Sequence, residues 1–133
     1  MSNPAYNKRR EDPPIWEGPR VGLWSDFVGL DDLDLLNIED IMYCLEWSML
    51  LVFEYSGFDR VVAPFVLGMS SFGNALLRGY QLEGNSKGGR GVGWRTFQVR
   101  EMSLVFRYWE FFNPEDFKFD RWYPWVHRVY KML

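Results

Sequence analysis

Three arginines are the residues whose type and spacing best suit ligand chemistry. Arg60, Arg78 and Arg95 each lie in, or at the start of, a segment whose composition predicts a β-strand. Their planar guanidinium groups bind phosphate or carboxylate through paired hydrogen bonds. Convergence on one sheet face would form an anion pocket with Tyr55 or Tyr80 as a stacking platform for a base. The alternative is that strand alternation directs Arg78 and Arg95 outward as solvated side chains.

A glycine-rich loop follows the third predicted strand. Residues 84–93 hold five glycines. Successive backbone N–H groups in such a loop can bind an anion, and Lys87 and Arg90 would add positive charge. The loop lacks the Gly-Lys-Ser/Thr ending of a Walker motif and joins two strands instead of a strand and a helix. We expect a flexible hairpin loop, with a loop that covers a ligand as the alternative.

Composition excludes several kinds of chemistry. The 133 residues include one cysteine and one histidine, which excludes an internal disulfide and a zinc site of the usual Cys/His kind. Nucleophilic catalysis with a histidine would depend on His127, which lies among aromatic residues near the C-terminus. We expect Cys44 to be a semi-buried, unreactive thiol. No catalytic group is recognisable, and we expect no enzyme, no cofactor and no metal.

The charged residues argue against two further kinds of binding site. A net charge of −3 argues against generic binding to a phosphate backbone, which depends on clustered lysine and arginine. The acidic run at residues 31–34 lacks the spacing and central glycine of a calcium loop. We therefore interpret it as solvated charge near the start of a helix.

The chain is rich in aromatic residues, and they gather near its end. Phenylalanine, tryptophan and tyrosine make up 19% of the sequence, and eleven of them fall between residues 106 and 130. A small domain cannot bury all of them, and exposed aromatic side chains are enriched at interface centres. The sequence predicts a partner interface that includes Trp109, Phe112 and Trp122.

Helical signals flank a central β region. Apolar residues at Ile38, Ile41 and Leu45 predict a helix from about residue 38, with Asn37 as its N-cap. Asn113 followed by Pro114 marks a second helical start, and the spacing of apolar residues predicts a closing helix over 125–133.

Between these signals lie short strands bounded by turn residues. The sequence predicts strands over 49–55, 60–69, 75–82 and 94–100, and a fifth that begins near residue 102. Pro64 predicts an edge, an end or a bulge in the second strand. Such regular spacing indicates a small closed or strongly curved antiparallel sheet.

The chain length predicts one domain. Residues 1–20 hold four prolines and a charged stretch, and we interpret them as a flexible arm. Residues 21–133 would form the single domain, with a barrel core at about 38–106 and a C-terminal extension at 107–133. No apolar run is long enough to span a membrane and no signal peptide is recognisable, so we expect a cytoplasmic protein.

The order of motifs over about residues 38–106 resembles that of WYL domains, in particular small stand-alone bacterial and phage WYL-like proteins. The resemblance rests on the segments Phe53-Glu-Tyr55, Arg60-Val-Val-Ala-Pro64, Gly73-Asn-Ala-Leu-Leu-Arg-Gly-Tyr-Gln81 and Gly93-Trp-Arg-Thr-Phe-Gln-Val99. It implies a mainly β fold: a small five-stranded Sm-like β-barrel with an N-terminal helix. It further implies a ligand-sensing module for nucleotides or nucleic acid, of the kind found in transcriptional regulators and defence systems, and not an enzyme.

The chain departs from the family pattern at several positions. Arg60 matches the arginine that precedes the family proline. Residues 75–77 read Ala-Leu-Leu where the family carries Trp-Tyr-Leu, and Gln98 and Glu101 replace two later arginines.

Two functional hypotheses follow. The first is a non-enzymatic WYL-like regulatory domain that senses an anionic ligand, either a nucleotide or single-stranded nucleic acid. The second is a protein-interaction module, for example a phage or mobile-element inhibitor of a host defence or regulatory protein. With no room for a DNA-binding helix-turn-helix, the chain would act through a partner or as a homodimer.

Overall fold

The computed structural model describes residues 29–119, except 87 and 90, together with 128–133; for 128–132 only the backbone is described. The elements run in the order α2 (Asp32–Trp47), β1 (Met49–Tyr55), β2 (Phe58–Met69), β3 (Ala75–Gly84), β4 (Gly93–Gln98), β5 (Ser103–Phe111) and β6 (Arg128–Met132). Short 3-10 turns occupy Val99–Glu101 and Pro114–Asp116. The predicted arm at residues 1–20 lies outside the described residues.

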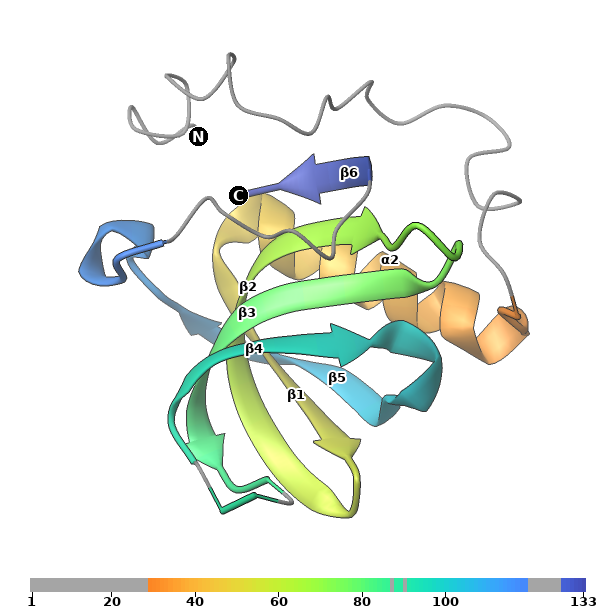
Figure 1. The fold of residues 1–133 in the computed structure, drawn as a ribbon. Helices are drawn as coiled ribbons and strands as arrows, with labels where there is room; N and C mark the ends of the chain where they lie inside the picture. Colours follow the sequence, from red (N-terminus) through yellow and green to blue (C-terminus); the bar gives the residue numbers. More distant parts are fainter. Residues whose placement is uncertain (1–28, 87, 90, 120–127) are drawn as a thin grey trace.

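One strongly curved antiparallel sheet forms the body of the domain, with α2 lying across it (Figure 1). The strand order is β4-β3-β2-β1-β5, and β6 pairs with β2. The predicted mainly β class with a helix in front of the sheet is confirmed. Among the described strands β4 and β5 do not pair with each other, so the sheet is open where a closed barrel was expected.

The helix begins six residues earlier than the sequence predicted. Asp31 is the N-cap: its side chain accepts a hydrogen bond from the Asp34 N–H, and the Asp34 side chain accepts from the Asp31 N–H. This reciprocal capping box satisfies two N–H groups that the first helical turn leaves free. Asn37, predicted as the N-cap, is instead buried inside the helix.

The predicted strands are confirmed with small shifts at their ends. Strand β1 spans the predicted residues, whereas β4 ends at Gln98 because residues 99–101 turn as a 3-10 helix. The pairing of β2 with β3 shifts register between Pro64 and Val66. Pro64 therefore lies at a bulge in which Phe65 is the extra residue, one of the places where a strand tolerates a residue without an N–H donor.

The C-terminus contradicts the predicted closing helix. Residues 128–132 form β6, which pairs with β2 from Val66 to Met69. Strand β1 pairs with β2 only up to Val62, so the rest of that β2 edge is open to another strand. Pairing with β6 satisfies the N–H and C=O groups along this edge of β2. The helical spacing of the C-terminal side chains gives no sign of this pairing. Asn113 and Pro114 begin a helical turn as predicted, but it is a single 3-10 turn.

The sheet buries apolar side chains on both faces. On the inner face, residues of α2 such as Ile41 and Leu45 pack with Leu51, Phe53 and Phe97. The rings of Phe53 and Phe97 meet edge to face with centroids 4.9 Å apart. On the outer face, Phe65 anchors a second cluster that draws in aromatic residues from beyond β5. None of the helices in the described ranges is long and apolar enough to cross a membrane.

Candidate functional site

Arg60 is a buried cation held by neutral groups. Only 3% of its surface is exposed. Its Nη2 donates to the backbone carbonyl of Tyr55 at 2.9 Å, and its Nη1 donates to Oε1 of Gln81 at 3.2 Å. Its Nε is buried without a hydrogen-bond partner, and no carboxylate of the described residues forms an ion pair with it. Burying such a group is costly unless a counter-charge is supplied.

Aromatic rings surround this guanidinium. Its Cζ lies 5.4 Å from the ring centroid of Tyr55, 5.9 Å from that of Phe58 and 5.7 Å from that of Phe97. The negative faces of aromatic rings stabilise a cation weakly, by roughly 0.5–2 kcal/mol each. They lower the cost of burial but do not neutralise the charge.

Arg95 lies on the same sheet face and adds a second positive charge. The pKa of Arg60 is lowered, first by burial and next by the charge of Arg95. The Gly91 carbonyl accepts hydrogen bonds from both Arg95 Nη2 and Gln81 Nε2, which ties the arginine to the glutamine. Two guanidinium groups are therefore held near each other across one buried amide.

Arg78 and Tyr80 lie on the opposite face of the sheet. Arg78 pairs with Thr96 in register, one position away from the Gly79–Arg95 pair, so the side chains of the two arginines point to opposite faces. Its Nη1 donates to Thr96 Oγ1 at 3.0 Å, and Cζ lies 5.6 Å from the Trp94 ring centroid. The Tyr80 ring packs against Trp94 in the outer cluster. The three arginines therefore do not converge: Arg60 and Arg95 do, and Arg78 does not.

Tyr55 belongs with the arginine pair, but its ring is engaged by the core. It meets Phe97 edge to face with centroids 5.0 Å apart, and its hydroxyl accepts the N–H of Gln98 at 3.0 Å. Burial is the main cause of the raised pKa of Tyr55. The ring walls the arginine site and is not a free stacking platform.

Two site residues were missed by sequence reasoning. Gln81 is fully buried and connects Arg60 to the carbonyl groups of the glycine-rich loop. Phe58 is half-buried beside the same guanidinium. Gln81 lies two residues after Gly79, so alternation places it on the face of Arg95, and that signal was available in the sequence. Lys87 and Arg90 of the loop lie outside the described residues.

The predicted partner interface is only partly exposed. Trp109 on β5 is 66% exposed. Phe112 is half-buried, with its ring centroid 5.6 Å from that of Phe65, because the outer cluster needs aromatic side chains to cover it. Phe112 therefore belongs to the outer cluster, and its place in a partner interface stays a prediction. Trp122 lies outside the described residues.

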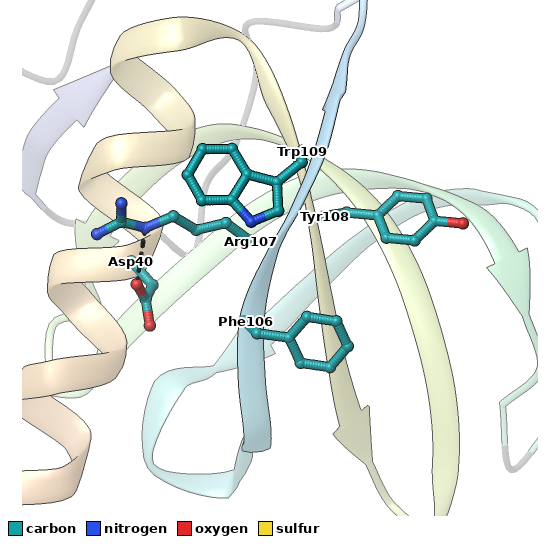
Figure 2. A pocket seen from close by; sticks show the side chains of 5 residues that line it. All are labelled: Asp40, Phe106, Arg107, Tyr108 and Trp109. Atoms are coloured by element: carbon teal, nitrogen blue, oxygen red, sulfur yellow. Dashed lines mark hydrogen bonds and ion pairs between the residues drawn. The ribbon is translucent and has the colours of Figure 1, made fainter.

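A surface depression of about 440 Å³ lies between β5 and α2 (Figure 2). Arg107 reaches from β5 towards the helix, where its Nε donates to Asp40 Oδ1 at 2.9 Å and its guanidinium lies 3.8 Å above the Tyr43 ring centroid. Phe106 and Tyr108 point away from the helix. The depression thus has an ion pair on one side and exposed aromatic rings on the other.

Among the described residues, Cys44 has a structural role. Cys44 is buried in the core, its thiol donates to the Leu50 carbonyl at 3.5 Å, and burial raises its pKa to about 12. A thiol that stays protonated is a poor nucleophile. Within the described part of the chain, no group of histidine, cysteine, aspartate and glutamate side chains could hold a metal ion.

Comparisons with known proteins give one structural similarity. No family model and no curated protein matches the chain. Among solved structures, the chain is similar to proteasome accessory factor B/C (PafBC) of Arthrobacter aurescens, with 25% sequence identity and a TM-score of 0.48. The match covers 62% of this chain and 13% of that chain, so it concerns a small part of a longer protein.

Proposed function

We propose that this protein is a non-enzymatic, WYL-like regulatory domain that binds an anionic ligand at Arg60 and Arg95. The observation that carries the proposal is the state of Arg60: a buried guanidinium with an unpaired Nε, no carboxylate partner among the described residues, and a second guanidinium nearby. A bound phosphate would provide the missing acceptor and the missing charge. Charge-assisted hydrogen bonds of this kind are worth about 1.5–3 kcal/mol each.

The glycine-rich loop would cover the bound ligand. Its Gly91 carbonyl already accepts a hydrogen bond from Nη2 of Arg95. Four of its glycines adopt positive φ angles: Gly84, Gly89, Gly91 and Gly93. These conformations need glycine and leave the loop without side chains at the points where it turns. An entering phosphate would replace the Gly91 carbonyl as the acceptor of Arg95. The ligand classes to be distinguished are inorganic phosphates, nucleotides and single-stranded oligonucleotides.

Calorimetric titration at low salt tests this proposal. The probes are pyrophosphate, a nucleoside triphosphate and a short oligonucleotide, each added to the wild type, Arg60→Met and Arg78→Met. We expect at least one probe to bind the wild type and Arg78→Met equally, and Arg60→Met at least about 30-fold more weakly, as loss of a buried charge partner implies. No binding by the wild type to any probe, or equal binding by all three proteins, would remove the proposal.

A further inference from the structure

One side of α2 carries a regular stripe of side chains that is exposed at both ends and partly buried in the middle. Leu33, Leu36, Asp40, Tyr43 and Trp47 follow one another at alternating spacings of three and four residues. This is the spacing of the a and d positions of a heptad, which places the side chains in a line along one side of a helix. Leu33 is 61% exposed, and Leu36 and Trp47 are each 57% exposed. We call these five residues the α2 stripe.

The α2 stripe continues onto β5. The exposed ring of Trp109 and the ring of Tyr43 form an edge-to-face pair with centroids 6.1 Å apart, and Tyr43 also packs against Trp47. Asp40 is the polar member of the stripe, and its ion pair with Arg107 crosses from the helix to the strand (Figure 2). A single polar group in an apolar helix seam fixes the register of the helix that packs on it.

Acidic residues border the α2 stripe. Asp32, Glu39 and Glu46 lie at intervals of seven residues along the flank of the stripe that faces away from the core, and all three are exposed. The helix contains five carboxylates and no lysine or arginine. Two copies of α2 would repel each other, because like charges that face across a helix interface are destabilising. The charge pattern thus favours a partner helix of opposite charge over a second copy of this chain.

We propose that the α2 stripe binds a cationic amphipathic helix of a partner protein. That helix would present apolar residues at its own a and d positions and lysine or arginine at the positions that face Asp32, Glu39 and Glu46. Helices recognised in this way dock through anchors spaced by three and four residues, and charge pairs along the seam select the partner. The surface is separate from the arginine pair, so the two proposals can fail independently.

Two synthetic helical peptides of about five turns provide the test. Both carry leucine at the a and d positions; one has lysine and the other has glutamate at the flanking positions. Each is labelled with a fluorophore and titrated with the full chain, and its anisotropy is measured. We expect the lysine peptide to bind at least about tenfold more tightly than the glutamate peptide, with an affinity that falls as salt is added.

Variants of exposed residues locate the binding surface without disturbing the core. Leu36→Glu should weaken the lysine peptide at least about tenfold, since it places a charge on the stripe. The matched control is Phe72→Glu, an exposed apolar residue outside both proposed sites, which should bind like the wild type. Glu39→Lys should weaken the lysine peptide and strengthen the glutamate peptide, a reversal that a mere loss of folding would not produce.

Several results would overturn the proposal. These are failure of the wild type to bind the lysine peptide, equal affinity for both peptides, and binding that Leu36→Glu leaves unchanged. Sedimentation of the wild type gives a further decisive outcome. Self-association that Leu36→Glu abolishes would show that a second copy of the chain occupies the α2 stripe.

Discussion

A glutamate in place of Gln81 would give Arg60 an acceptor with a negative charge inside the protein. The Oε1 of Gln81 already lies 3.2 Å from Arg60 Nη1, and the side chain is fully buried. Gln81→Glu keeps the shape of the side chain and adds a charge at that position. The new carboxylate would then compete with any external anion for the same guanidinium.

The expected magnitude follows from the contacts of Gln81. Opposite charges at this separation attract by roughly 4–5 kcal/mol at an effective dielectric constant of about 20, and burial of the carboxylate costs several kcal/mol. The carboxylate also cannot donate to the carbonyls of Asn85 and Gly91 as Nε2 does, so we expect the free energy of unfolding to fall by about 1–3 kcal/mol. An external anion at Arg60 Nε would then face a neutralised guanidinium and a nearby carboxylate. We expect it to lose about as much as one charge-assisted contact, about 1.5–3 kcal/mol, which corresponds to about 10- to 150-fold weaker binding.

Calorimetry with the best anionic probe, together with thermal unfolding, would measure both effects. Gln81→Met is the matched control, because it removes the amide without adding a charge and should retain anion binding within a few-fold. Wild-type affinity in Gln81→Glu would refute the reasoning. Equal losses in both variants would mean that the amide, and not the charge balance of Arg60, controls binding.

Three further predictions test the fold. Gly79→Ala would place Cβ 2.7 Å from the Ala63 carbonyl oxygen and should lower the free energy of unfolding by about 2–3 kcal/mol, against about 1 kcal/mol for Gly57→Ala, whose Cβ meets nothing but whose φ is +83°. Asp31→Ala should cost about 1 kcal/mol in chemical denaturation, because the helix loses its cap. Because the pKa of Cys44 is raised to about 12, only the unfolded thiol ionises above about pH 9. The stability of the wild type should therefore fall relative to Cys44→Ala as the pH rises from 9 to 12, and a constant difference would contradict the burial argument.

Local patterns predicted the sheet well because its strands are bounded by turn residues. The limits of β1 and the bulge at Pro64 follow from strand composition and from the missing proline N–H. The start of α2 was missed because the capping box uses aspartate at both positions, and because Leu33 and Leu36, being exposed, do not share the periodicity of the core face. The C-terminal strand was missed because a tertiary contact, an open edge of β2, outweighs a helical spacing of side chains.

The candidate site could be predicted only in part. Arginine composition pointed to Arg60 and Arg95, but their convergence depends on strand register, and a shift of one residue would exchange Arg95 with a neighbour on the other face. Arg78 was included because it also lies in a predicted strand. Arg60 is buried by contacts with Gln81 and Phe97, which lie on other strands. The sequence around Arg60 therefore does not predict that its side chain is buried.

The most direct test of the central claim is the Nε–H resonance of Arg60 in a nitrogen-15 NMR titration with pyrophosphate at low salt. This N–H is buried and has no acceptor. We predict that its proton resonance moves downfield and saturates as the anion binds, while the N–H of a distant side chain such as the Trp47 indole stays in place. An Arg60 resonance that does not move at any anion concentration would contradict the claim that this guanidinium is an anion site.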